Sequence, residues 1–159
     1  MQLNKQLESL NSFSFPSTEL PIVHAIIDFK SKSAKESSAK IECSTRILAK
    51  STINDIDLAI LLGNLLDNAI EATAVLPDHS KKEIRVFVEV TEPQMIVSVT
   101  NPVIKDINVN HLKTTKNDSQ NHGYGLLAVR RIADKYNGTL LLDCQNNTFG
   151  ASAVLNQPE

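Results

Sequence analysis

Changes in the spacing of apolar residues along the chain predict two long helices in its first half. Residues 19–39 place apolar side chains close to every third or fourth position, which predicts a helix with Pro21 in its first turn. Residues 51–76 return to the same spacing after a short polar stretch. Asn54 or Asp55 is the predicted N-cap of this second helix, because short polar side chains accept hydrogen bonds from the first free backbone N–H groups.

Strict alternation of apolar and polar residues predicts five strands. The first strand, over residues 40–48, lies between the two helices. Residues 82–92 and 94–102 alternate and are rich in valine, and the short link "PQ" between them predicts a hairpin. Residues 139–145 and 149–156 form a second predicted hairpin around the dipeptide "NN".

The remaining segments complete the expected organisation of the chain. Residues 1–18 are polar and indicate a linker or the end of an upstream element, so the folded domain is expected over residues 19–159. Residues 102–122 show no periodicity, which is typical of a functional loop, and residues 123–138 predict a helix opened by glycines. The mixture of helices and hairpins predicts an α+β fold: one mixed, mostly antiparallel sheet with helices on one face.

Composition and charge exclude several classes of protein. The 159 residues include 42% hydrophobic and 21% charged residues, an ordinary balance for one globular domain. A net charge of −2 gives no basic footprint for nucleic acid. The chain shows neither a membrane span nor a signal peptide, and we expect this domain to be cytoplasmic. Cys43 and Cys144 are predicted to be buried small hydrophobic residues rather than a disulfide.

The second helix carries an unusual polar stripe. Asn64, Asp67, Asn68 and Glu71 fall on one narrow face because spacings of three, four and seven residues bring side chains together on a helix. One interpretation is a solvent face, although the stripe contains no Lys or Arg. The other is a cation site in a nucleotide cleft, since Mg²⁺ is usually held by one or two protein oxygens together with substrate phosphates.

A second candidate motif opens the last helix. In "NHGYGLL", Gly123 and Gly125 follow the long polar loop directly. Glycines allow a ligand to approach the backbone, and a helix N-terminus presents free N–H groups to phosphate. A simple tight turn is the alternative interpretation. Lys116, in the loop before this motif, is either a phosphate ligand or an ordinary solvated lysine.

Together these motifs resemble the GHKL ATPase superfamily, which includes histidine kinases, type II topoisomerases, the ninety-kilodalton heat-shock chaperones and mismatch-repair ATPases. "LLGNLLDNAIEA" resembles its N-box, "HGYGLLAVRRIADKYNGTL" resembles the G-box of histidine kinases, and "VSVTNP" is similar to the strand that leads to the adenine. The similarity is strongest to quorum-sensing receptor kinases of the accessory-gene-regulator type, in which an I-x-x-x-K-x-x-x-A helix precedes the N-box. Ile26, Lys30 and Ala34 fit that pattern, and the resemblance covers about residues 20 to 156.

The resemblance implies a two-layer α/β sandwich, the Bergerat ATP-binding fold, with a long lid over ATP and Mg²⁺. Asn68 would coordinate Mg²⁺, and Asn64 would contact the phosphates or the waters of the ion. Asn101 stands where most relatives carry the aspartate that binds the adenine amino group. The other residues that the resemblance places at the nucleotide lie in the lid and at the start of the last helix: Lys116, His122, Gly123, Tyr124, Gly125 and Leu126.

Three positions depart from the usual pattern of the family. The D-x-G-x-G box is absent, and Asn101 leaves only a neutral acceptor for adenine; the quorum-sensing subgroup shares this departure. Asn64 replaces the glutamate that activates water in the ATPase branches, so efficient hydrolysis is not expected. Glu71 stands where kinases often carry Lys or Arg.

The sequence offers no phosphoacceptor of the histidine kinase type. None of the four histidines is followed by Asp or Glu: His24, His79, His111 and His122. His24, on a mostly apolar helix, is interpreted as a residue at the edge of the core. We therefore expect the catalytic part of a kinase whose acceptor histidine lies on an upstream dimerisation domain, absent from this chain.

The resemblance also implies partners and alternatives. The full-length protein would be a homodimer attached to the cell membrane, and it would pass phosphate to a response regulator. Two alternatives stay open: a GHKL serine kinase of the anti-sigma type, and a nucleotide-binding signalling module without kinase activity. The lack of the second-box glycines weakens the serine kinase, because that branch resembles the standard kinases there.

Overall fold

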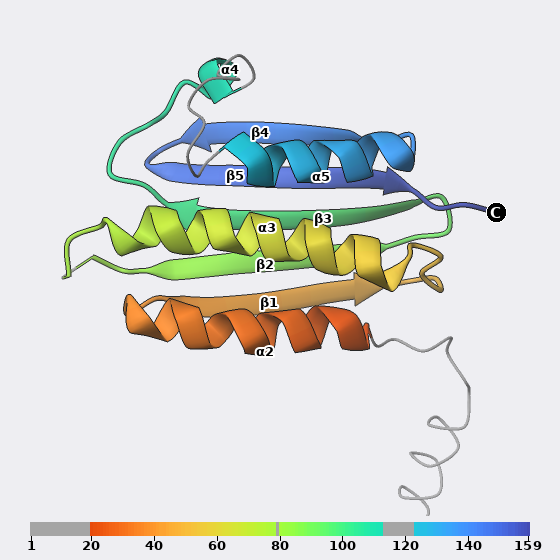
Figure 1. Cartoon of the computed structure of the whole chain (residues 1–159), viewed down its shortest axis with the longest axis horizontal. Helices are drawn as coiled ribbons and strands as arrows, with labels where there is room; N and C mark the ends of the chain where they lie inside the picture. The colour runs from red at the N-terminus through yellow and green to blue at the C-terminus, as the bar shows by residue number, and fades with distance from the viewer. Residues whose placement is uncertain (1–19, 79, 113–122) are drawn as a thin grey trace, which may run out of the picture.

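The computed structural model describes residues 20–78, 80–112 and 123–159, which form a five-stranded sheet covered by helices. Figure 1 shows the strands side by side in the order β1-β2-β3-β5-β4. The first two strands are parallel, and the other three pairings are antiparallel. The predicted mixed, mostly antiparallel sheet is therefore confirmed. The strands are β1 (Lys40–Ile47), β2 (Glu83–Val90), β3 (Gln94–Pro102), β4 (Thr139–Gln145) and β5 (Thr148–Asn156).

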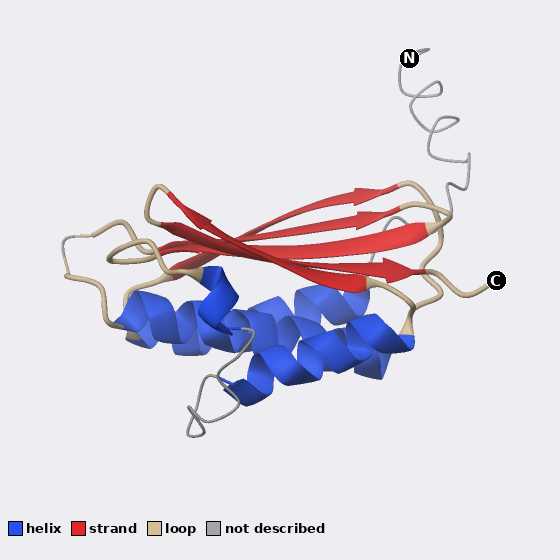
Figure 2. Ribbon diagram, turned by 90° about the horizontal axis from the view of Figure 1, so that it is seen from above, coloured by secondary structure: helices blue, strands red, loops and turns tan. Residues whose placement is uncertain are grey.

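All of the described helices lie on one face of the sheet (Figure 2). They are α2 (Pro21–Glu36), α3 (Asp55–Ala74), α4 (Val109–Leu112) and α5 (Gly123–Lys135). The core fills the space between this helical layer and the sheet, as the alternation of the strands predicts. Its largest fully buried side chains come mainly from α3 and the central strands: Leu58, Leu61, Leu62, Leu66, Ile84, Val86, Val88, Met95, Val97 and Leu155.

The start of α3 follows from one side chain. The Oδ1 atom of Asn54 accepts hydrogen bonds from the backbone N–H groups of Ile56 at 2.8 Å and Asp57 at 3.4 Å. Asn54, rather than Asp55, is therefore the N-cap. Since α3 connects β1 to the parallel strand β2, it must cross the sheet between them. Its apolar arc packs on the sheet, and its polar stripe is left facing the neighbouring helices.

The described part of the predicted loop over residues 102–122 includes the single turn of α4. Its first residues are tied to the turn of the β4–β5 hairpin. The Oδ1 atom of Asp106 accepts a hydrogen bond from the N–H of Asn147 at 2.7 Å, and the N–H of Val103 donates to the carbonyl oxygen of Asn147 at 2.9 Å. The absence of periodicity concealed these contacts because they join segments distant in sequence. Residues 113–122 lie outside the described residues, as do residues 1–19.

The predicted hairpin around "NN" is confirmed, and its geometry explains the dipeptide. Asn146 and Asn147 have φ values of 53° and 56°, the left-handed conformation that a two-residue hairpin turn requires and that asparagine tolerates. Gly138, just before β4, is required for another reason. A Cβ atom at this position would lie 1.7 Å from the carbonyl oxygen of Val154, so any other residue would collide with the backbone of β5.

Two predictions about burial are wrong. Cys43 is exposed and Cys144 is only half-buried. Cys43 lies on β1, an edge strand on which most residues are exposed. His24 is exposed rather than at the edge of the core, because α2 turns this side away from α3 and the sheet. No helix in the described part of the chain is long and apolar enough to cross a membrane.

Candidate functional site

The two polar motifs of the sequence meet where α5 packs beside α3. A Cβ atom built at Gly125 would lie 3.3 Å from the Oδ1 atom of Asn68 and 3.4 Å from the Oδ1 atom of Asn64. Both asparagine side chains are half-buried in this contact. Without a side chain on Gly125, the two amide groups stay accessible beside the backbone that opens α5. A larger residue would fill the space in which a small ligand could reach them.

The members of the polar stripe have different environments. The Nδ2 atom of Asn64 donates to the carbonyl oxygen of Ile60 at 2.8 Å, which turns the Oδ1 atom toward α5. Asp67 is exposed and faces α2 instead, where its Oδ1 atom lies 2.7 Å from the Nζ atom of Lys30. The stripe is therefore not a simple solvent face, because its middle lies between two helices. Glu71, at its C-terminal end, is exposed.

The side chain of Lys30 reaches the polar stripe by passing over Gly63 of α3. Its Cε atom lies 3.8 Å from the Cβ position of Gly63. The side chain of Lys30 is only 18% exposed, whereas that of Asp67 is 51% exposed. Both residues line a groove of about 260 Å³ between α2 and α3, together with Ile26, Phe29, Ala59, Ile60, Gly63 and Asn64. Sequence spacing could not find this pair, because spacing within one helix does not show which residue of another helix lies opposite.

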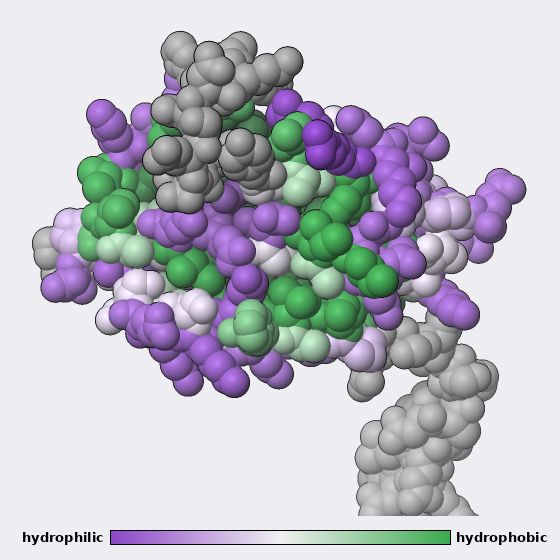
Figure 3. Space-filling model, viewed as in Figure 1, coloured by the Kyte–Doolittle hydropathy of each residue, from purple (hydrophilic) through white to green (hydrophobic). Residues whose placement is uncertain are grey.

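Hydrophobic surface continues from this groove. Ile56 and Ile60 on α3 and Phe29 on α2 are exposed although they are large and apolar. Figure 3 shows hydrophobic surface (green) over the N-terminal part of α3 and hydrophilic surface (purple) farther along the helical face. The polar end of the groove, at Asn64, is the end that touches α5.

Asn101 lies at the end of β3, on the face covered by helices. It continues the buried positions Met95, Val97 and Val99, and its side chain is only 3% exposed. Its Nδ2 atom donates to the carbonyl oxygen of Pro102 at 3.1 Å, so the Oδ1 atom remains the available acceptor for a ligand donor. Asn101 is the residue at which the resemblance to the family implies the contact with adenine.

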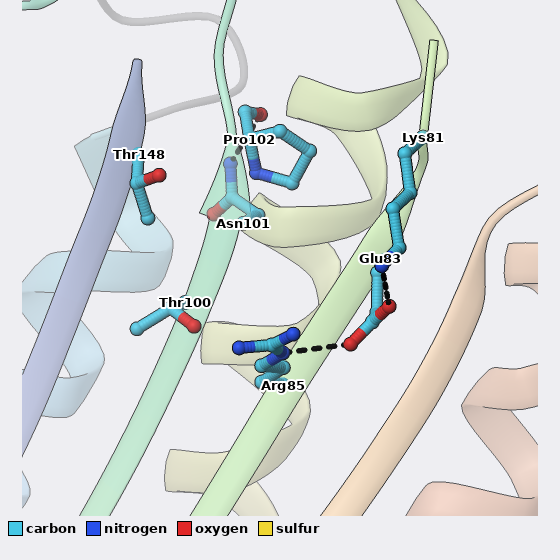
Figure 4. A pocket seen from close by; sticks show the side chains of 7 residues that line it. All are labelled: Lys81, Glu83, Arg85, Thr100, Asn101, Pro102 and Thr148. Atoms are coloured by element: carbon cyan, nitrogen blue, oxygen red, sulfur yellow. Dashed lines mark hydrogen bonds and ion pairs between the residues drawn. The ribbon is translucent and has the colours of Figure 1, made fainter. Parts of the chain in front are cut away.

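A cavity of about 240 Å³ lies beside Asn101 (Figure 4). Its charged residues on β2, Glu83 and Arg85, alternate with buried residues and therefore point away from the helices. Hydrogen bonds from Arg85 and Lys81 hold the pKa of Glu83 at about 2, below its usual range. The other lining residues are Thr100, Pro102 and Thr148. Glu83 therefore forms ion pairs with both cations that line this cavity, Lys81 and Arg85.

The structure covers only part of the remaining predicted site. Gly123 and Tyr124 form the first residues of α5, while the half-buried side chain of Leu126 packs against the hydrophobic core. Lys116 and His122 lie outside the described residues. The structure therefore brings together Asn64, Asn68 and Gly125, and it places Asn101 at the end of the strand under the same helical layer.

The donor atoms fit a hard cation. Carboxamide oxygens are suitable ligands for Mg²⁺, which usually takes one or two protein oxygens and completes its shell with phosphates and water. Asn68 offers such an oxygen toward the space that a side chain at position 125 would occupy. Within the described residues, no group of three or more His, Cys, Asp or Glu residues is placed to hold a metal ion.

Comparison with known families decides the relationship of the chain. The sequence model of the GHKL domain matches residues 53–156, which include α3, the whole of β2 to β5, and α5. The chain belongs to the GHKL domain family. It is a GHKL ATP-binding domain, and α2 with Lys30 lies outside the matched region.

Solved structures show how this GHKL domain is built. The nucleotide-free catalytic domain of the histidine kinase ThkA superposes with a TM-score of 0.67 at 18% identity, covering 86% of this chain and 90% of that one. The Acinetobacter baumannii histidine kinase AdeS gives a TM-score of 0.61 at 17% identity, covering 87% of this chain and 64% of that one. No curated protein sequence matches. The predicted α+β fold is thus confirmed as that of histidine kinase catalytic domains.

Proposed function

We propose that this GHKL domain is the ATP-binding catalytic part of a sensor histidine kinase. It transfers the γ-phosphate of ATP to a histidine on a dimerisation segment outside this sequence. The observation that carries the proposal is the contact of Gly125 with Asn64 and Asn68, because it joins the N-box and the G-box at one place. The fold shared with histidine kinase catalytic domains supports it.

Each residue of this place has a proposed role. Asn68 holds Mg²⁺ through its amide oxygen, and Asn64 contacts the phosphates. The ion neutralises charge on the phosphate oxygens when it is bound. Gly123 and Gly125 let the phosphates approach the N–H groups that open α5. Asn101 accepts a hydrogen bond from the adenine amino group through its Oδ1 atom.

The site favours transfer to a protein acceptor over hydrolysis. Water attack needs a general base within hydrogen-bond reach, and the amide of Asn64 cannot accept a proton usefully. A histidine acceptor brings its own nucleophile. In the transfer, a bond forms between an imidazole nitrogen and the γ-phosphorus, the bond to the bridging oxygen breaks, and ADP leaves.

The quorum-sensing receptor type is the subgroup that we propose. Its helix before the N-box corresponds to α2, in which Ala34 is fully buried and Lys30 contacts the stripe. Its lack of a D-x-G-x-G box agrees with Asn101. This subgroup implies a homodimeric, membrane-attached full-length protein and a response regulator as the next acceptor of phosphate.

Two measurements test the proposal. Calorimetry with a non-hydrolysable ATP analogue should show binding by this chain that is stronger with Mg²⁺ than without it. With γ-labelled ATP, the chain alone should remain unlabelled, while the intact receptor should be labelled on a histidine outside this sequence. That label should be acid-labile and base-stable, as a phosphoramidate is. Acid-stable label on a serine of a partner protein would overturn the histidine kinase and favour the anti-sigma type.

A further inference from the structure

The ion pair between Lys30 and Asp67 lies close enough to the candidate site for Lys30 to contact a ligand as well. Lys30 comes from α2, yet its ammonium lies against the polar stripe of α3, 2.7 Å from Asp67. Asp67 is the residue directly before Asn68 and one turn after Asn64. Lys30 and Asn64 line the same groove. The ammonium is therefore held against Asp67, in the groove that Asn64 also lines.

A cation at this position would stabilise the negative charge of a bound triphosphate. A triphosphate brings several negative charges close to the carboxylate of Asp67, and like charges at this range repel. A lysine ammonium has three donors, and Asp67 accepts from one of them. The others are available for phosphate oxygens.

The direction of the nucleotide follows from the arrangement of the elements. Figure 1 shows that β3 ends, at Asn101, on the side of the molecule where α3 also ends. An adenine bound at Asn101 therefore lies toward the C-terminal half of α3. With the roles proposed for Asn68 and Asn64, the phosphate chain would extend past Asn68 toward Asn64, which lines the groove of Lys30.

We propose that Lys30 contacts the terminal phosphate of the bound nucleoside triphosphate and supplies a cation at the phosphate end of the site. This inference rests on the proposed function, since it assumes that the site binds a nucleotide. It assigns a ligand contact to α2, which lies outside the matched family region. The competing role is structural: Lys30 would only neutralise Asp67 and tie α2 to α3.

Four variants separate the two roles: Lys30→Gln, Lys30→Arg, Asp67→Asn, and the double variant that combines Lys30→Gln with Asp67→Asn. Each is titrated by calorimetry with Mg²⁺ and AMP, ADP or a non-hydrolysable ATP analogue. We expect Lys30→Gln to lower affinity for the triphosphate about tenfold, the scale of a lost hydrogen bond to a charged group, with little change for AMP. Lys30→Arg should retain most of the affinity, and Asp67→Asn should leave it unchanged or higher.

The double variant decides between the roles. If Lys30 contacts phosphate, the double variant should bind the triphosphate more weakly than Asp67→Asn does, because removing Asp67 does not replace the lost donor. Equal affinity of the double variant and Asp67→Asn would show that Lys30 only neutralises Asp67, and would overturn the inference. An equal loss for AMP, ADP and triphosphate would overturn it too, as a general effect on the fold. If the wild-type chain binds none of these nucleotides, the proposed function itself fails.

Discussion

Gly125 on α5 stands over Asn68 on α3, with only 3.3 Å between its Cβ position and the Oδ1 atom of the asparagine. This distance is tighter than nine in ten contacts that real Cβ atoms make, so a side chain at position 125 requires the amide of Asn68 to move by a few tenths of an ångström. The last helix can therefore approach the N-box helix closely without covering its amides.

Gly125→Ala should weaken nucleotide binding without unfolding the domain. The added methyl group would lie 3.3 Å from the Oδ1 atom of Asn68, so this amide must move by a few tenths of an ångström, and overpacking typically costs about 1–3 kcal/mol. We expect affinity for an ATP analogue to fall by about tenfold or more, measured by calorimetry. Gly63→Ala is the matched control in α3, where a Cβ would meet only Lys30 Cε at 3.8 Å. If both variants bind like the wild type, the contact is not part of the site.

Asn68→Ala should remove the Mg²⁺-dependent part of nucleotide affinity. The amide oxygen is the proposed protein ligand, and a contact to a charged group is typically worth about 1.5–3 kcal/mol. Titrations with and without Mg²⁺ should therefore give nearly equal affinities for this variant. Asn68→Asp, which keeps an oxygen at the same place, should retain part of the dependence. An alanine variant with the full Mg²⁺ effect would refute the assignment of this residue.

The chain should hydrolyse ATP very slowly. General bases typically contribute about 10²–10⁴-fold to rate, and Asn64 supplies none. Phosphate release by the purified domain should stay near the background of the assay, and Asp67→Asn or Glu71→Gln should not change it. Rapid release that one of these acid variants abolishes would show that the stripe contains a water-activating carboxylate after all.

Acid should destabilise the fold partly through Glu83. The pKa of this carboxyl group is lowered from 4.5 to about 2 by hydrogen bonds from Arg85 and Lys81. A carboxylate with a lowered folded pKa contributes stability above its unfolded pKa, and this contribution is lost as pH falls toward the folded value. The thermal midpoint of the wild type should therefore fall as pH decreases from about 5 to about 2.

Glu83→Gln should show a smaller decrease over the same pH range, because it has no proton to take up. The matched control is Glu92→Gln. Glu92 is exposed in the turn between β2 and β3 and makes no ion pair with any described residue. If the two variants lose stability in parallel with the wild type, the pairing of Glu83 does not contribute to acid stability.

Much of the fold could be predicted because the information is local. The spacing of leucines in α3, the cap at Asn54 and the pair Asn146–Asn147 each depend on residues a few positions apart. The motifs around Asn68 and Gly125 are equally local. Their meeting was predicted only through a resemblance to a family, since no spacing within one element shows which element packs beside it.

The errors have a common physical origin. Residue type predicts Cys43 in the core, and the apolar helix around His24 predicts that residue at the edge of the core. Exposure instead depends on which strand lies at the edge of the sheet and which side of α2 is covered. The contacts of Asp106 with the β4–β5 turn were missed for the same reason. They join side chains to backbone groups that are about 40 residues away in the sequence.

The elements, their order and the chemistry of the two motifs can be read from the sequence, because period, caps and turn residues act through neighbouring backbone groups. That Lys30 lies against Asp67, and that Gly125 lies over Asn64 and Asn68, depends on the three-dimensional packing of the helices. Such pairs depend on how helices pack on a shared sheet. Packing is set by the whole apolar surface that the core buries, and not by the few polar residues that the site employs.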